Sequence, residues 1–114
     1  RRPAASAAGA GSVVPVDCPL PPNTDRATWR SALQKALSHV ADYAPDQLII
    51  SLGVDTFETD PISFFKLKSE AFATYGADIA SLNLPTLFVM EGGYDIAEIG
   101  VNTVNVLQGF EGAA

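Results

Sequence analysis

One stretch of the sequence decides the fold, Leu48-Ile49-Ile50-Ser51-Leu52-Gly53-Val54-Asp55-Thr56-Phe57-Glu58-Thr59-Asp60-Pro61. It begins with an apolar run that ends at Gly53, and a single carboxylate, Asp55, follows two residues later. This pattern is typical of a buried parallel strand. Ligands of open α/β sheets bind outside the carboxyl ends of such strands, so Asp55 is expected at the rim where a ligand would lie.

A second stretch repeats this arrangement further along the chain. We expect another buried strand over Pro85-Thr86-Leu87-Phe88-Val89-Met90, followed by the loop Glu91-Gly92-Gly93-Tyr94. Because the carboxyl ends of parallel strands meet at one edge of a sheet, the two loops are expected at the same rim.

A first helix is predicted before these strands. Residues 26–43 carry apolar side chains at three- and four-residue spacing, which indicates an amphipathic helix. Thr24 or Asp25 is expected to cap its first turn. The first strand should then run over residues 47–52.

Two further helices are predicted from the same periodicity. One covers residues 69–82, with Ser69 as its cap. The other covers residues 96–110, and Gly109 and Gly112 are expected to mark its fraying end.

The predicted order is helix, strand, helix, strand, helix, which indicates an α/β fold with a parallel sheet. Both strands are apolar on both faces, so they require neighbouring strands and covering helices that this chain does not supply. We therefore expect residues 13–114 to be part of a larger domain. Residues 1–12 carry no periodicity and are expected to form a flexible tail.

Composition excludes several classes of protein. The 114 residues are 47% hydrophobic, enough to fill a core, and the net charge of −6 argues against a nucleic-acid partner while suiting a cationic one. No apolar run reaches the roughly 18 residues that span a bilayer, so no membrane partner is expected. A single cysteine, Cys18, excludes an internal disulfide and fits a reducing, cytoplasmic compartment.

The residues of the two loops each allow two interpretations. Asp55 is either a catalytic carboxylate or metal ligand, or a residue that caps the local turn. Gly92 and Gly93 either aim Tyr94 over the rim or form a turn beside a partly buried aromatic. Glu91 is either a second acid or a solvated loop charge.

A complete metal site does not follow from the residues alone. Catalytic zinc normally takes three protein ligands. Asp55 is one credible donor, whereas Cys18 and His39 lie in no ligand-spaced motif. The sequence also lacks a phosphate-binding loop and a Ser-His-Asp set.

The two loops together resemble a known family. The runs 51–67 and 90–94 closely resemble the C-terminal part of the arginase/histone-deacetylase superfamily, nearest to bacterial acetylpolyamine amidohydrolase-like deacetylases. Residues 19–24, Pro-Leu-Pro-Pro-Asn-Thr, and the helix that follows are similar to the same family. The resemblance extends over residues 13–110 and implies a fragment of the three-layer parallel-sheet arginase/deacetylase fold.

The resemblance implies a role for five residues. Asp55 corresponds to the aspartate that ligates the catalytic zinc. Tyr94 corresponds to the tyrosine that donates a hydrogen bond to the substrate carbonyl as it becomes an oxyanion. Ile62 corresponds to an apolar residue of the channel for acetyl-lysine or acetylpolyamine, and Gly92 and Gly93 to the part of that channel that presents the tyrosine.

The implied reaction is zinc-assisted amide hydrolysis, with a histidine that moves the proton. The family's His-His pair and Asp-x-His zinc motif do not occur in this sequence, and Lys68 stands where threonine is frequent. We therefore expect roughly the last third of such an enzyme, inactive alone and completed by the remainder of the catalytic domain. The substrate would be an acetylated cationic small molecule or acetyl-lysine, and the resemblance is compatible with a homodimer.

Two other hypotheses stay open at this point. The chain could be a non-catalytic interaction module in which Asp55 and Tyr94 are relics. It could also be a small nucleotide-binding α/β domain, for which the strand-end glycines are the argument.

Overall fold

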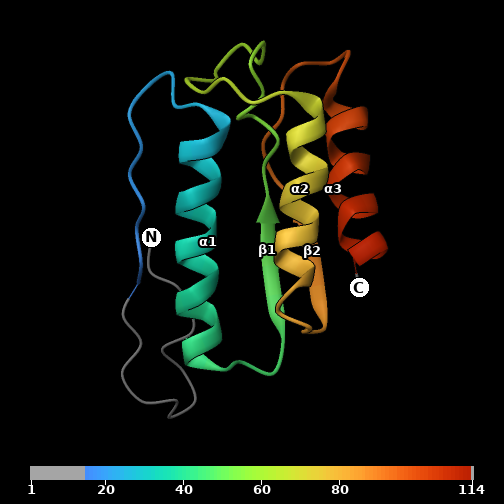
Figure 1. The fold of residues 1–114 in the computed structure, drawn as a ribbon. Helices are drawn as coiled ribbons and strands as arrows, with labels where there is room; N and C mark the ends of the chain where they lie inside the picture. The colour runs from blue at the N-terminus through green and yellow to red at the C-terminus, as the bar shows by residue number, and fades with distance from the viewer. Residues whose placement is uncertain (1–14, 114) are drawn as a thin grey trace.

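The computed structural model describes residues 15–113, so the predicted tail over residues 1–12 lies outside the described residues. Helices and strands alternate along the chain in the predicted order (Figure 1). The elements are α1 (Arg26–Tyr43), β1 (Leu48–Leu52), α2 (Ser69–Ala80), β2 (Thr86–Met90) and α3 (Ile99–Ala113).

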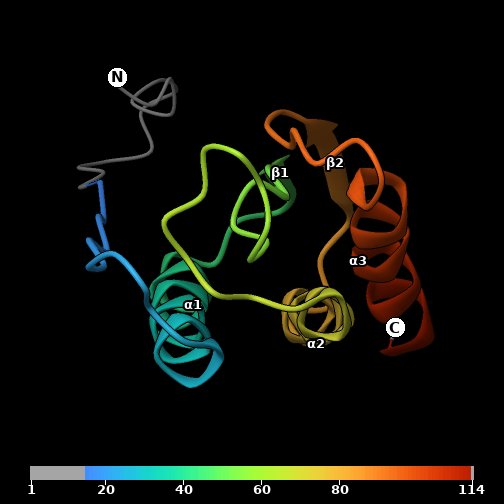
Figure 2. The ribbon, with the colours of Figure 1, turned by 90° about the horizontal axis from the view of Figure 1, so that it is seen from above.

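The two strands of the described residues pair in parallel, with Leu48 opposite Thr86 and Leu52 opposite Met90. All three helices lie on one side of this sheet (Figure 2). The other face is apolar and exposed: Ile49 keeps 67% of its surface and Leu87 58%. Strands of this kind need a second covering layer, which residues 15–113 do not provide.

The cap of α1 is as predicted. Asp25 adopts an extended backbone conformation, and its Oδ1 accepts a hydrogen bond from the Thr28 amide at 2.9 Å. The side chain thereby satisfies one of the amides that have no partner within the helix. The helix ends where Ala44 turns into the left-handed region.

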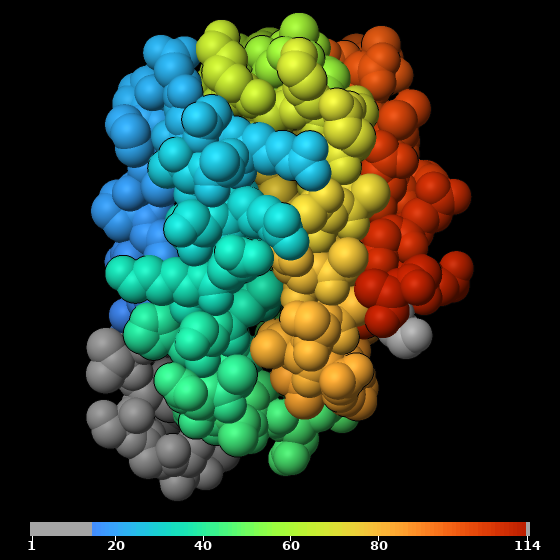
Figure 3. All heavy atoms as spheres, viewed as in Figure 1, coloured from blue at the N-terminus to red at the C-terminus, as the bar shows by residue number. Residues whose placement is uncertain are grey.

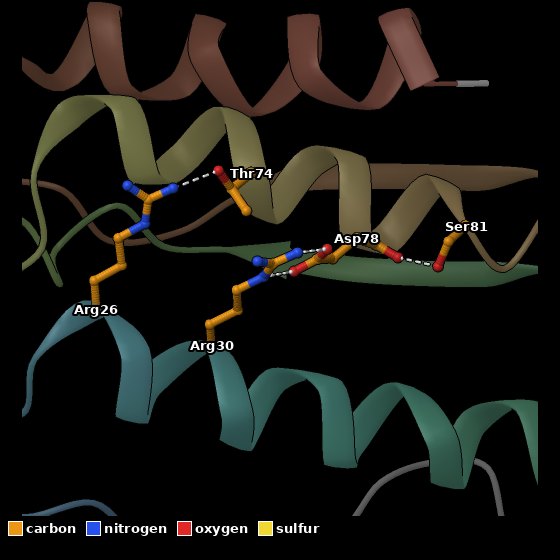
Figure 4. Close-up of polar contacts among 5 residues, drawn as sticks. All are labelled: Arg26, Arg30, Thr74, Asp78 and Ser81. Atoms are coloured by element: carbon orange, nitrogen blue, oxygen red, sulfur yellow. Dashed lines mark hydrogen bonds and ion pairs between the residues drawn. The ribbon is translucent and has the colours of Figure 1, made fainter.

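Polar side chains join α1 to α2 (Figure 4). The Arg30 guanidinium donates to both carboxylate oxygens of Asp78, each at 2.9 Å, and Arg26 donates to the Thr74 hydroxyl at 2.8 Å. The Ser81 hydroxyl donates to the Asp78 carbonyl at the end of α2. Figure 3 shows the outer surface of this helical layer, where α1, α2 and α3 lie side by side.

The core lies between the sheet, α2 and the loop that follows β1. Its side chains contact one another in a single cluster that α3 closes through Val106. The members are Leu52, Val54, Phe57, Leu67, Ala71, Phe72, Tyr75 and Val106. Within residues 15–113, no helix is both long and apolar enough to cross a membrane.

The start of α2 differs from the prediction. Ser69 was expected as the cap, but Lys68 occupies the cap position and its side chain makes no capping hydrogen bond. The Lys68 ammonium instead pairs with Glu58 at 3.1 Å. Ser69 is therefore the first helical residue, because the extended conformation that precedes the helix falls one residue earlier.

Both ends of α3 also differ from the prediction. The helix begins at Ile99, not at residue 96, because the carbonyl of Asp95 first forms a turn with the amides of Glu98 and Ile99. Gly109 does not mark a fraying end, since the helix continues to Ala113. Gly109 is instead where α3 approaches α2: a Cβ there would lie 1.9 Å from the Ala73 carbonyl oxygen.

Candidate functional site

The hydrogen-bond ladder of the sheet continues into the two loops. The Glu91 amide donates to the Leu52 carbonyl at 2.8 Å, and the Val54 amide donates to the Gly92 carbonyl at 2.9 Å. The loops therefore leave the carboxyl ends of β1 and β2 together, as Figure 2 shows. This arrangement brings Asp55 to the same rim as the glycine-tyrosine turn, as predicted.

The Asp55 carboxylate lies against two glycines. A Cβ at Gly53 would lie 2.8 Å from Asp55 Oδ1, and a Cβ at Gly92 would lie 2.3 Å from Asp55 Oδ2. Both distances are shorter than a van der Waals contact, so a side chain at either glycine would displace the carboxylate. Gly92 was predicted to line the substrate channel and present the tyrosine; the structure places it directly against the Asp55 carboxylate.

Gly93 is required by its backbone as well as by its surroundings. Its φ of +148° is disfavoured for any residue with a side chain, and a Cβ would lie 2.7 Å from Val54 Cγ2. The turn that carries Tyr94 therefore depends on glycine, as the sequence indicated. Tyr94 itself projects from the rim and keeps 51% of its surface exposed.

Asp60 is a site residue that the sequence interpretation did not single out. Its side chain is buried, with 5% of the surface exposed. Oδ1 accepts from the Ile62 amide at 3.0 Å, and Oδ2 accepts from the Tyr94 amide at 2.7 Å. Asp60 thus makes the turn-capping contacts that had been the alternative interpretation of Asp55. An Asp followed by Pro-Ile in a loop is an Asx-turn signal, but it gives no hint of the bond to Tyr94.

A second hydrogen bond joins the same two loops. The Thr59 hydroxyl donates to the Asp95 carboxylate, one residue beyond Tyr94. The predicted channel residue Ile62 follows Asp60 in the same loop and is 55% exposed. The exposed side chains of Ile62 and Tyr94 thus both belong to the paired loops.

The rim carries more than one carboxylate, among them Asp55 after β1 and the exposed Glu91 after β2. The Asp55 oxygens are suitable zinc ligands, because the two glycines beside the carboxylate have no side chains that would cover it. Cys18 packs toward the Ala32 carbonyl, and His39 is exposed on α1. Among residues 15–113, no three His, Cys, Asp or Glu side chains gather as a metal site. Asp55 therefore fits one position of a catalytic zinc, but these residues do not complete the set.

Several known proteins are similar to this chain in sequence. A profile of the histone deacetylase domain matches residues 2–110. Acetylpolyamine amidohydrolase 2 of Pseudomonas aeruginosa is 55% identical over 104 residues, and acetylpolyamine amidohydrolase of Mycoplana ramosa is 46% identical over 104 residues. Each alignment covers 91% of this chain and 30% of the relative, so the chain spans about 30% of the length of these curated relatives.

A solved structure shares the fold. The crystal structure of acetylpolyamine aminohydrolase from Burkholderia pseudomallei superposes with a TM-score of 0.83 at 34% sequence identity. The superposition covers 86% of this chain and 29% of that chain. The helix-strand-helix-strand-helix unit therefore occurs within a larger α/β protein.

Proposed function

The chain belongs to the histone deacetylase domain family, and we propose that it is the C-terminal segment of a zinc-dependent amidohydrolase that removes acetyl groups from acetylated amines. Acetylpolyamine is the favoured substrate class, because the relatives at 46% and 55% identity are named for it. Acetyl-lysine is the other candidate. The net charge of −6 is consistent with a cationic polyamine.

One observation carries this proposal: the Asp55 carboxylate rests on Gly92, within the turn that presents Tyr94. A metal ligand and a hydrogen-bond donor that act on the same amide must lie close to one another. The contact between Asp55 and Gly92 brings together the two loops that carry Asp55 and Tyr94. The alternative interpretations, a turn cap and a chance aromatic, do not require such contact.

We assign Asp55 as one zinc ligand. Bound zinc would supply a Lewis acid for the amide carbonyl and for a water molecule. The chain contributes a carboxylate that lies close to Gly53 and Gly92, where any larger residue would displace it. The remaining ligands and the proton-transferring histidine belong to the rest of the catalytic domain in this proposal.

We assign Tyr94 as the donor to the developing oxyanion. Its phenol is a hydrogen-bond donor on an exposed side chain, so it can reach a substrate at the rim. Gly93 gives the turn the backbone conformation that only glycine adopts readily. Ile62, exposed on the facing loop, would line the channel that leads to this donor.

The rest of the domain would complete the chain in two ways. It would supply the missing metal ligands, and it would cover the exposed sheet face that includes Ile49 and Leu87. In this proposal residues 13–114 form the C-terminal portion of one deacetylase domain. The whole enzyme works in the cytoplasm, and the proposal is compatible with a homodimer. The 114-residue chain alone would be inactive.

The test uses the full-length product of the gene that encodes this chain. Release of acetate from N-acetylputrescine and from an acetyl-lysine peptide is measured for the wild type, with and without a zinc chelator. Activity is expected to require zinc and to fall at least about 100-fold in Asp55→Ala. Asp46→Ala is the matched control, because Asp46 is exposed before β1, at the opposite end of the strand. Full activity of the Asp55→Ala protein would refute the assignment.

A non-catalytic interaction module is the second candidate. The exposed apolar face of the sheet favours it. A full-length protein that neither binds zinc nor releases acetate would decide for this function. The nucleotide-binding hypothesis gains nothing from the comparisons, since the relatives are amidohydrolases.

A further inference from the structure

We propose that Asp60 is a positioning residue, whose buried carboxylate holds the backbone of Tyr94 and so limits the region that the tyrosine hydroxyl can reach. This inference rests on the proposed function of Tyr94 as the oxyanion donor. It concerns a residue that would touch neither the metal nor the substrate. Two interactions carry it, and we call them together the cross-loop clamp: Asp60 with the Tyr94 amide, and Thr59 with the Asp95 carboxylate.

The clamp joins residues that are far apart in sequence. Asp60 and Tyr94 are separated by 34 positions, and Thr59 and Asp95 by 36. Two adjacent residues of the loop after β1 thus bind two adjacent residues of the loop after β2. Such a double contact restricts rotation of the second loop as well as its distance from the first.

The Asp60 bond is the stronger half of the clamp. A carboxylate that accepts from an amide forms a charge-assisted hydrogen bond, and the length of 2.7 Å agrees with one. Asp60 is 5% exposed, so water competes little for the carboxylate. Thr59 lies at the surface, and its bond to Asp95 is expected to contribute less.

The position requires a carboxylate and not an amide. Oδ1 faces the Ile62 N–H and Oδ2 faces the Tyr94 N–H, so both oxygens must accept. An asparagine would turn its NH₂ group toward one of these two donors and lose that bond. Asp60→Asn therefore removes the clamp or the local turn with almost no change in side-chain volume.

The glycines explain why Tyr94 needs an anchor. Gly92 and Gly93 precede it directly, and glycine leaves the backbone more freedom than any other residue. The same residues that permit the turn would otherwise allow Tyr94 to move relative to Asp55. The Asp60 bond is made at the first amide after the glycines, which is where it restricts that motion most.

The test is a double-mutant cycle in the full-length enzyme. Asp60→Asn is expected to lower kcat about 10- to 100-fold with KM changed less than about threefold, because a displaced donor weakens the transition state more than substrate binding. Combined with Tyr94→Phe, the Asp60→Asn substitution should lower kcat less than about twofold further, since the hydroxyl it positions is gone. Equal effects of Asp60→Asn in both backgrounds, or no effect in the wild type, would overturn the proposal.

Two controls separate positioning from general damage to the fold. Glu58→Gln changes an acid of the same loop whose only described partner is Lys68, and it should leave kcat unchanged. Thr59→Val removes the weaker half of the clamp at the surface, so it covers the case in which Asp60→Asn does not fold. It should lower kcat about two- to fivefold, and only when Tyr94 is present. A Thr59→Val effect of the same size in the Tyr94→Phe background would count against the clamp.

A measurement without substrate distinguishes this inference from the proposed function. Hydrogen exchange of residues 91–97, followed by mass spectrometry, should be at least about tenfold faster in Asp60→Asn than in the wild type. If the wild type shows no amidohydrolase activity, the proposed function fails. Asp60→Ala cannot make the bond to the Tyr94 amide, so unchanged exchange in both Asp60→Asn and Asp60→Ala overturns the clamp whatever the activity.

Discussion

The contact between Gly92 and Asp55 leads to a sharp prediction for Gly92→Ala. The added methyl carbon would lie 2.3 Å from Asp55 Oδ2 and 2.8 Å from Asp55 Cγ. Carbon-oxygen contacts rarely fall below about 3.3 Å, so the carboxylate must withdraw by about 1 Å. Gly92 does not have a positive φ, so alanine is compatible with the backbone and the clash with Asp55 is the main effect.

Gly92→Ala is expected to cause a large loss of activity and a small loss of stability. A displacement of about 1 Å in a catalytic group can cost about 100-fold in rate, so kcat/KM of the full-length enzyme should fall by about that factor. The Asp55 side chain is only partly buried and can swing toward solvent. The free energy of unfolding should therefore change by no more than about 1 kcal/mol.

The assay is acetate release together with zinc content, and Gly100→Ala is the control. A Cβ at Gly100 would meet nothing within 4 Å, and the residue lies within α3. Gly100→Ala should keep full activity and gain about 0.5–1 kcal/mol of stability. A Gly92→Ala enzyme with wild-type kcat/KM and zinc content would refute the assignment of Asp55 as a ligand held by Gly92.

Further predictions concern the packing of the helices and are measured by urea unfolding of the full-length protein. Gly109→Ala places a methyl group 1.9 Å from the Ala73 carbonyl oxygen, so the free energy of unfolding should fall by about 3 kcal/mol. Gly112→Ala points into open space and should raise the free energy of unfolding by about 0.5–1 kcal/mol. Equal stabilities of the two variants would contradict this packing. The buried Tyr75 hydroxyl has no hydrogen-bond partner among the described residues, so Tyr75→Phe should leave stability unchanged or raise it by about 1 kcal/mol; a clear loss would indicate a partner. Burial raises the pKa of the Tyr75 hydroxyl, so as the pH rises this hydroxyl ionises in the unfolded state before it does so in the folded state. The free energy of unfolding should therefore fall as the pH rises above about 10. The Tyr75→Phe protein should show a smaller fall.

Local sequence patterns were sufficient to predict the helices and strands and to place Asp55 and Tyr94 at one rim of the sheet. The apolar spacing of residues 26–43 gave the bounds of α1, and Asp25 proved to be its cap. The paired loops indicated the family that the comparisons confirm. The assigned roles of Asp55 and Tyr94 stay predictions until the full-length protein is assayed.

Two of the errors lie where a contact from a distant segment set the local structure. Gly109 looked like the end of a helix, but α2 approaches so closely there that only glycine fits within α3. The start of α3 was placed at residue 96, whereas Asp95 is tied to Thr59 and forms a turn before the helix begins at Ile99.

The sequence by itself determined the order of helices and strands, the parallel sheet and the rim that carries Asp55 and Tyr94. These follow from periodicity, caps and strand-end glycines, which act over a few residues. Only the tertiary structure decided that Gly92 rests against the Asp55 carboxylate and that Asp60 binds the Tyr94 amide. The physical reason is that both contacts join loops more than 30 residues apart in the chain, and their geometry is fixed only when β1 and β2 pair.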